Sequence, residues 1–98
     1  MTSSALEFAI PLAQSVTVTD DALCVELSDG RALSVPLAWF PRLLHATPKE
    51  RSHFRIVGGG EGLHWQSLDE DISVESLLLG RRSSESLASL ARWAAERT

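Results

Sequence analysis

The fold is decided by residues 15–37, which read SVTVTDDALCVELSDGRALSVPL. Three runs in this segment alternate apolar with polar residues, the period of a strand that buries one face. Asp20-Asp21 marks a turn after the first run, and Asp29-Gly30 marks a hairpin after the second, because glycine tolerates the positive φ that such turns need. The segment predicts a three-stranded antiparallel meander whose apolar face another element must cover.

A second stretch with the period of a strand surrounds the glycine-rich run 58–62, GGGEG. Phe54 and Ile56 precede the run, and Leu63 and Trp65 follow it. The run has the glycine count of a phosphate-binding loop, but it lacks the Gly-Lys-Ser/Thr ending and leads into a strand instead of a helix. We interpret it as the turn of a second hairpin.

Residues 38–52 change to a helical pattern. Pro41 suits the first turn of a short helix. Thr47-Pro48-Lys49-Glu50 reads as a capping box, with Thr47 at the N-cap and Glu50 reaching back to it. We therefore expect two short helical turns that join at Thr47.

Two further helices are predicted toward the C-terminus. Ser73 is placed as the N-cap of a short helix that follows an acidic turn and stops at Gly80. The last helix is expected over residues 84–97, with Ser83 as its N-cap. Its narrow apolar stripe, flanked by Trp93, contains Leu87, Leu90, Ala91 and Ala94. We expect this stripe to dock on the domain or to pair with a second copy.

These elements predict an α+β fold: an antiparallel sheet of about five strands, made of a three-stranded meander plus a hairpin, with short helices and a C-terminal helix. The 98 residues suit one small domain. We divide the chain into an N-terminal arm (1–14), a single α+β domain (15–80) and a C-terminal helix (81–98).

Composition excludes several classes of function. The net charge of −4 argues against broad electrostatic binding to nucleic acid or to anionic membranes. The single cysteine, Cys24, rules out an intrachain disulfide and indicates a reducing compartment. The sequence shows neither a signal-peptide pattern nor an apolar run near the roughly 20 residues that cross a bilayer. We expect a cytoplasmic protein.

The acidic run Asp69-Glu70-Asp71 is the first candidate site. Its carboxylates suit a hard cation, but a calcium site needs further ligands at spaced positions, so we favour a charged turn without metal. His64 lies close in sequence, and a pair of His64 with Asp69 or Asp71 would suit general acid–base work. A structural hydrogen bond from His64 to the acidic turn is the favoured reading.

Four arginines form the second candidate site: Arg31, Arg42, Arg51 and Arg55. Their convergence would create an anion-binding patch, since guanidinium groups bind carboxylates and phosphates through two hydrogen bonds. We favour the alternative that they pair with the acidic turn.

We predict no catalytic residue, no cofactor and no metal ligand. The predicted interaction surface consists of aromatic and charged residues of the middle segment and the last helix: Trp39, Arg42, His64, Trp65, Asp69, Glu70, Asp71 and Trp93. Most large aromatic residues of a small domain belong to its core, and one exposed to solvent would mark a contact surface.

Short motifs in residues 14–80 resemble one bacterial family. They are Asp29-Gly30-Arg31, Val35-Pro36-Leu37, Trp39-Phe40-Pro41-Arg42-Leu43, Ala46-Thr47, Glu50-Arg51, Gly62-Leu63-His64-Trp65, Leu68-Asp69-Glu70-Asp71-Ile72-Ser73 and Leu77-Leu78-Leu79-Gly80. Their order and spacing are similar to the "domain of unknown function 2442" family. The resemblance implies a small, stand-alone α+β protein, without established catalytic residues. Some members carry a helix-turn-helix domain after the shared one, and others lie in paired operons reminiscent of toxin–antitoxin systems.

The sequence therefore favours a non-enzymatic protein-interaction module, with an unknown protein or a second copy as its partner. One alternative is a nucleic-acid-linked regulator or an antitoxin-like partner. The charge balance disfavours direct binding to nucleic acid, and the 18 residues after Gly80 suit one helix, which is too little for a helix-turn-helix unit. The second alternative is a small hydrolase or metal-dependent enzyme that uses His64 with Asp69 or Asp71.

Overall fold

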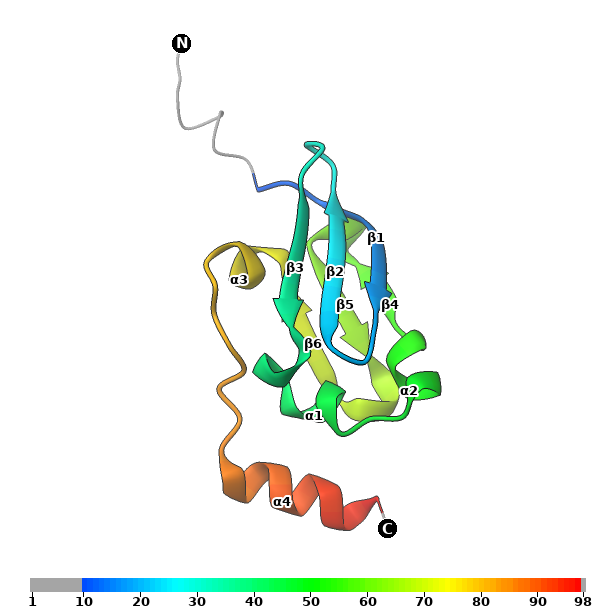
Figure 1. The fold of residues 1–98 in the computed structure, drawn as a ribbon, viewed down its shortest axis with the longest axis vertical. Coiled ribbons are helices and arrows are strands. Elements are labelled where there is room, and N and C mark those ends of the chain that lie inside the picture. The colour runs from blue at the N-terminus through cyan, green and yellow to red at the C-terminus, as the bar shows by residue number, and fades with distance from the viewer. Residues whose placement is uncertain (1–9, 98) are drawn as a thin grey trace.

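The computed structural model describes residues 10–97. Its strands form two three-stranded antiparallel sheets, with the orders β1-β2-β3 and β4-β5-β6. The first sheet contains β1 (Ala13–Val18), β2 (Ala22–Leu27) and β3 (Ala32–Pro36), and the second contains β4 (Arg55–Val57), β5 (Gly62–Trp65) and β6 (Glu70–Ser73). Figure 1 shows the second sheet behind the first. The predicted meander and hairpin are both confirmed, and the fold is α+β.

The strand count differs from the prediction of about five, because the acidic run contributes a sixth strand, β6. A 3-10 turn, η4 (Gln66–Leu68), ends β5, and Asp69 adopts a left-handed conformation (φ 52°) that sends the chain back. Residues 70–73 then pair with β5, and Ile72 is buried opposite Leu63. Acidic residues are rare in strands, so the pattern alone indicated only a turn.

The core lies between the two sheets. Leu23, Val25, Leu27 and Val35 come from the first sheet, and Leu63, Trp65 and Ile72 come from the second. Each side chain is at most 8% exposed. The two-residue period of the sequence thus gives the inward side of both sheets, as predicted.

Short helical segments close one end of this sandwich (Figure 1). They are η2 (Leu37–Trp39), α1 (Pro41–Leu44) and α2 (Pro48–Ser52). The predicted capping box is confirmed: Thr47 Oγ1 accepts from the Glu50 N–H, and the Glu50 carboxylate accepts from the Thr47 N–H. The box satisfies two backbone N–H groups at the start of α2.

Ser73 caps helix α3 (Val74–Leu78), and Gly80 follows its C-terminus with a φ of 72°, as predicted. The prediction of Ser83 as the cap of the last helix is wrong. Helix α4 (Leu87–Glu96) begins after Ser86, whose hydroxyl accepts from the Ser89 N–H. Ser83 instead donates its N–H to the Trp39 carbonyl, so the chain stays without regular structure up to residue 86.

The predicted arm falls mostly on residues 1–9, which lie outside the described part of the chain. Its last residues belong to the sandwich, because Ala13 opens β1 and Leu12 exchanges hydrogen bonds with Ser28. Within residues 10–97, no helix has the length and apolar content that crossing a membrane requires.

Candidate interaction site at the α4 end of the sandwich

Arg42 joins three segments at the end of the sandwich. Pro41 starts α1 and places the Arg42 side chain toward the turn before β6, where Nη1 donates to the carbonyls of Leu68 (3.0 Å) and Asp69 (3.2 Å). Nε and Nη2 bind the Glu85 carboxylate at 2.6–3.0 Å. These hydrogen bonds lower the pKa of Glu85 and raise that of Arg42. Both side chains are largely buried, so this ion pair is well ordered.

Trp93 is the anchor of α4. It is 8% exposed, and it lies between two guanidinium groups, Arg42 at 5.4 Å and Arg97 at 4.4 Å from the ring centre. Arg97 binds Glu50 of α2 through two hydrogen bonds, 2.7 and 2.9 Å long. The docking of α4 therefore combines one buried indole with two arginine–glutamate ion pairs. Arg42–Glu85 lies just before the helix, and Glu50–Arg97 lies at its C-terminal end.

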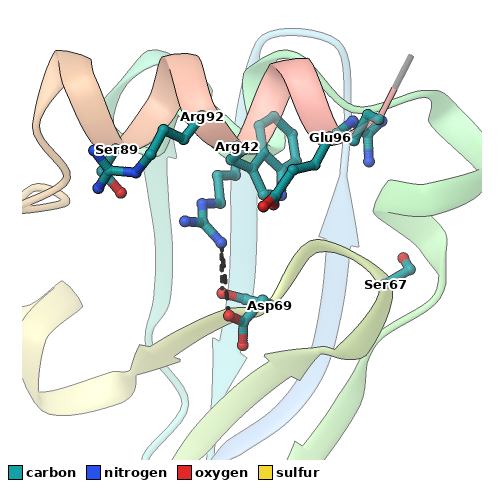
Figure 2. Close-up of a pocket in the computed structure, with 8 residues that line it drawn as sticks. Arg42, Ser67, Asp69, Ser89, Arg92 and Glu96 are labelled. Carbon is teal, nitrogen blue, oxygen red and sulfur yellow. Dashed lines mark hydrogen bonds and ion pairs between the residues drawn. The ribbon is translucent and has the colours of Figure 1, made fainter.

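A cleft of about 360 Å³ lies between α4 and the turn that precedes β6. We call it the α4 cleft, and it is lined by Arg42, Ser67, Asp69, Ser89, Arg92, Trp93, Glu96 and Arg97. Figure 2 shows Ser89, Arg92 and Glu96 on the helix above it and Ser67 and Asp69 below. The Asp69 side chain is 90% exposed and approaches Arg42 only to 3.9 Å.

On the other side of α4 is an apolar groove of about 450 Å³. Leu87, Leu90, Ala91 and Ala94 of the helix line it together with Trp93, Arg97 and His45. Leu87 is 86% exposed, and both alanines are exposed. The predicted apolar stripe is thus real, but α4 docks through Trp93, which the sequence analysis placed beside the stripe. Most of the stripe faces solvent.

Glu70 is the first residue of β6. It pairs with Trp65 across β5 and β6 and so lies on the core-facing side of β6. Burial is the largest cause that raises its pKa, and together with the carboxylates of Glu85, Asp71 and Asp69, and against the opposing effect of Arg42, it brings the pKa to about 7. A carboxyl group that titrates near neutrality is placed to respond to changes around Arg42.

His64 and Asp71 lie on the opposite, outward face of the second sheet. They are a cross-strand pair, and His64 Nδ1 lies 2.6 Å from Asp71 Oδ1. The predicted hydrogen bond from His64 to the acidic run is therefore confirmed. Such a pair orients an imidazole for proton transfer. Ser73, the hydroxyl two residues further along the strand, donates to Ser76 Oγ and accepts from its N–H, so it caps α3.

The structure brings three of the predicted surface residues together at the α4 cleft, Arg42, Asp69 and Trp93, but the inclusion of Trp93 as a surface residue is wrong, because it is buried. Trp39 contacts Arg82 and Ser83, and Glu70 lines a second cavity with Arg81 and Arg82. His64 and Asp71 lie elsewhere, on the outward face. The inclusion of Trp65 as a surface residue is wrong, because its side chain is fully buried and its indole N–H donates to the Arg51 carbonyl at 3.0 Å.

The four arginines of the predicted anion patch do not converge. Arg31 pairs with its neighbour Asp29, and Arg55 lies on the outward face opposite His64. Arg51 is buried. Arg42 alone reaches the acidic run, which agrees in part with the favoured alternative. Within the described residues, no three His, Cys, Asp or Glu side chains are grouped as a metal site.

Sequence reasoning missed Glu50, Glu85 and Arg97 as members of the site. The Trp93–Arg97 contact has a signal in the sequence, since residues four apart share one side of a helix. The pairs Arg42–Glu85 and Glu50–Arg97 have no such signal, because 43 and 47 residues separate their members.

Residues 13–83 match the model of a family described as "Protein of unknown function (DUF2442)". This match confirms the resemblance seen in the motifs. No curated protein matches the chain.

The fold is also found in solved structures. A crystal structure of a protein of unknown function from Rhodospirillum rubrum is 26% identical, with a TM-score of 0.67, over 79% of this chain and 95% of that one. A solution NMR structure of an uncharacterized protein from Chromobacterium violaceum is 28% identical, with a TM-score of 0.65, over 94% of this chain and 79% of that one.

Proposed function

Since the chain belongs to the DUF2442 family of proteins of unknown function, we propose from its own surface that it is a non-enzymatic protein-interaction module, whose contact surface is the α4 end of the sandwich. The observation that carries this proposal is the exposure of Leu87. An isolated leucine on a surface is ordinary, but this one begins a row that continues through Ala91 and Ala94 into the apolar groove. Contiguous apolar surface of this kind is typical of protein contact sites.

The charges in the α4 cleft, on the other side of α4 from the groove, indicate the chemistry of the partner. The side chain of Arg92 makes no hydrogen bond or ion pair within residues 10–97. Asp69 lines the same cleft as Arg92, its side chain is 90% exposed, and the whole chain carries a net charge of −4. The partner that fits is a protein segment with an apolar side chain for the groove and a basic side chain for Asp69.

The test is capture of partners from a lysate of the cells that encode the chain, followed by binding of the purified candidate. Three baits are compared: the wild type, Leu87→Glu, and the control Thr17→Glu, which changes an exposed residue on the outward face of the first sheet. We expect one protein that the wild type and Thr17→Glu retain and Leu87→Glu loses. Equal capture by all three baits would refute the α4 end as the contact surface.

Self-association is measured in parallel by analytical ultracentrifugation. A dimer of the wild type that Leu87→Glu dissociates would identify the partner as a second copy. Circular dichroism and urea denaturation show that the variants fold, and both are expected to match the wild type, because the substituted side chains are exposed.

A second candidate function, acid–base catalysis of hydrolysis, is favoured by the His64–Asp71 pair. Asp71 fixes the imidazole through Nδ1 and so directs Nε2 away from it. Turnover of activated aryl esters that both His64→Gln and Asp71→Asn abolish would support this candidate. Rates at the level of buffer, or rates that either variant retains, would reject it.

A further inference from the structure

Strand β6 is an edge of the second sheet, and part of its backbone has no partner. The Val74 N–H donates to the Glu61 carbonyl at 2.9 Å, which sets the alternation of the hydrogen bonds between β5 and β6. In an antiparallel pair, every second residue bonds to the neighbouring strand. The first and third residues of β6 therefore bond to β5, while the N–H and carbonyl of Asp71 and the N–H of Ser73 point away from it. Within residues 10–97, these three groups have no hydrogen-bond partner.

This free edge opens into a cavity of about 320 Å³, which we call the β6 cleft. One wall is β6 itself, residues 70–73, and the other is the segment 81–84, which follows α3; Phe40 and Ser76 complete the lining. Figure 1 shows the segment after α3 passing beside the sandwich on its way to α4. An open strand edge and a space beside it therefore lie together.

The second wall of the cleft is fixed at two points. The Arg81 N–H donates to the Ser76 carbonyl, and the Ser83 N–H donates to the Trp39 carbonyl, each at 3.0 Å. These bonds tie the segment to α3 on one side and to η2 on the other. The cleft is thus formed before any partner binds, which lowers the cost of ordering it.

The same wall carries two arginines without a carboxylate. Neither Arg81 nor Arg82 forms an ion pair with any residue in the described range 10–97. The Arg82 guanidinium lies 4.9 Å from the centre of the Trp39 ring, and this contact holds it in place. A guanidinium group binds a carboxylate through two charged hydrogen bonds. The wall therefore favours a partner with acidic side chains.

The acidic residues of β6 do not take this role. Asp71 binds His64 on the outward face of the sheet, and Glu70 lies on the core-facing side. Side chains of a strand stand perpendicular to the sheet, so both carboxylates lie off the line along which another strand would pair. The edge between them is left for main-chain contacts.

We propose that β6 is a docking edge for an extended acidic segment of another protein, which pairs with the free backbone groups of Asp71 and Ser73 and places a carboxylate against Arg82. In this mode of recognition, main-chain hydrogen bonds give the affinity and side-chain contacts give the specificity. The site goes beyond the proposed function, because it lies on another face than the apolar groove of α4.

A second copy of the chain fits this edge less well than a separate partner. Two β6 strands that pair antiparallel through their free groups would place both Asp71 side chains on one face as diagonal neighbours. Like charges in such positions repel. Each copy also carries a net charge of −4, which opposes association.

The test uses a peptide of sequence SETVETS with acetylated and amidated ends, added to the intact chain and followed by NMR. The amide hydrogen of Asp71 is free in the structure and should exchange rapidly without peptide. At saturation we expect its exchange to slow at least about tenfold, while that of Ile72, which β5 already protects, changes little. An unchanged exchange rate of Asp71 would overturn the docking edge.

Three control probes separate strand pairing from attraction by charge alone. The first is the same peptide with its two central amides methylated, which blocks both of its edges; the second is SKTVKTS; the third is inorganic phosphate. We expect none of them to slow the exchange of Asp71. Since the chain is acidic, general electrostatics favours the lysine peptide, so a preference for SETVETS reports the cleft itself. Equal binding of any of the three controls would overturn the proposal, and phosphate would then mark an anion site only.

Variants of the chain test the two walls separately. Arg82→Glu should weaken binding of SETVETS at least about tenfold. Arg55→Glu is its matched control, because Arg55 is exposed on the outward face and has no ion pair within residues 10–97, and it should bind as the wild type. Equal losses in the two variants would overturn the role of Arg82.

The backbone is tested by Asp71→Pro, which removes the free N–H. Proline is tolerated on an edge strand where its nitrogen faces outward, so we expect a folded variant that no longer binds the peptide. Asp71→Asn keeps the N–H and should retain binding. Urea denaturation checks the fold, and the methylated peptide tests the same hydrogen bonds if Asp71→Pro does not fold.

Analytical ultracentrifugation without peptide tests the other occupant. We expect no dependence of Asp71 exchange on protein concentration. Protection of the Asp71 amide that appears only as a dimer forms would identify a second copy at the edge and would overturn the separate acidic partner.

Discussion

Glu50 and Arg97 form a bidentate ion pair that links α2 to the end of α4, with Nη2–Oε1 at 2.7 Å and Nη1–Oε2 at 2.9 Å. The same Glu50 Oε1 accepts the Thr47 N–H at 2.9 Å and so completes the capping box. One carboxylate therefore stabilises the start of α2 and the docking of α4. These hydrogen bonds lower the pKa of Glu50 to about 2, with Arg97 as the first cause.

The first prediction concerns the free energy of unfolding at acid pH. Because the pKa of Glu50 is lowered on folding, its contribution to stability is complete above about pH 4.5 and is lost as the pH falls toward 2. Glu50→Gln should reduce the free energy of unfolding by about 1–2 kcal/mol at pH 7, after allowance for partial solvent screening. Urea denaturation at pH 7 and pH 3 checks this. A difference from the wild type that does not shrink at pH 3 would contradict the role of the charge.

The second prediction concerns Glu70, whose shift has the opposite sign. Its pKa is raised to about 7, so its protonated form stabilises the fold below about pH 4.5, and that stability is lost as the pH rises through 7. Glu70→Gln should match the wild type near pH 5 and exceed it by about 1–2 kcal/mol at pH 8.5, a figure reduced for the exposed part of the side chain. Denaturation at the two pH values measures the gap. A variant less stable than the wild type at pH 8.5 would show that ionised Glu70 is well paired.

Local sequence patterns predicted most of the fold, because most strands and helix starts in it depend on residues that are close in sequence. The alternation around Leu23 and Val25 gives their inward side, and the box at Thr47 gives the start of α2. The sixth strand was missed because Asp69 and Asp71 read as turn residues, and only pairing with β5 makes residues 70–73 a strand. The N-cap of α4 was placed at Ser83 instead of Ser86 for a similar reason. Both serines suit an N-cap, and only the structure shows that the Ser83 N–H donates to the Trp39 carbonyl and that the helix begins after Ser86.

The site could be predicted only in part. Arg42, Asp69 and Trp93 were predicted as aromatic or charged site residues, and the structure brings these three together. Which charge pairs with which depends on where α4 docks, and no local pattern contains that information. Trp65 shows the same limit, since the period of its strand gives a side of the sheet but not whether another layer covers that side.

The third prediction concerns Arg51, a buried residue whose guanidinium binds the carbonyls at the end of α1. Its Nε and Nη2 donate to the carbonyls of Leu43 and Leu44, both at 2.8 Å, and its Nη1 binds Asp20. Lysine has neither the planar group nor the number of donors to replace it. Arg51→Lys should cost about 2–3 kcal/mol of unfolding free energy, because buried carbonyls lose their donors.

Asp20→Asn is the control for Arg51. The Asp20 side chain is 85% exposed, so the loss of this ion pair should change stability by less than about 0.5 kcal/mol. Equal effects of Arg51→Lys and Asp20→Asn in urea denaturation would show that water or other donors satisfy the α1 carbonyls.

The last prediction separates two glycines of the run between β4 and β5. A Cβ on Gly60 would lie 2.7 Å from the Leu12 Cβ and 2.9 Å from the Ala13 carbonyl oxygen, and the φ of +118° is strained for any other residue. Gly59 also has a positive φ, +66°, but a Cβ there would meet nothing within 4 Å. Gly60→Ala should therefore destabilise the fold by about 3 kcal/mol or more, because β1 must shift, and Gly59→Ala by about 1 kcal/mol from backbone strain alone. Thermal and urea denaturation of the two variants give the comparison. Equal losses would mean that β1 does not approach the glycine run as closely in solution, and the start of the sandwich at Ala13 would then need another explanation.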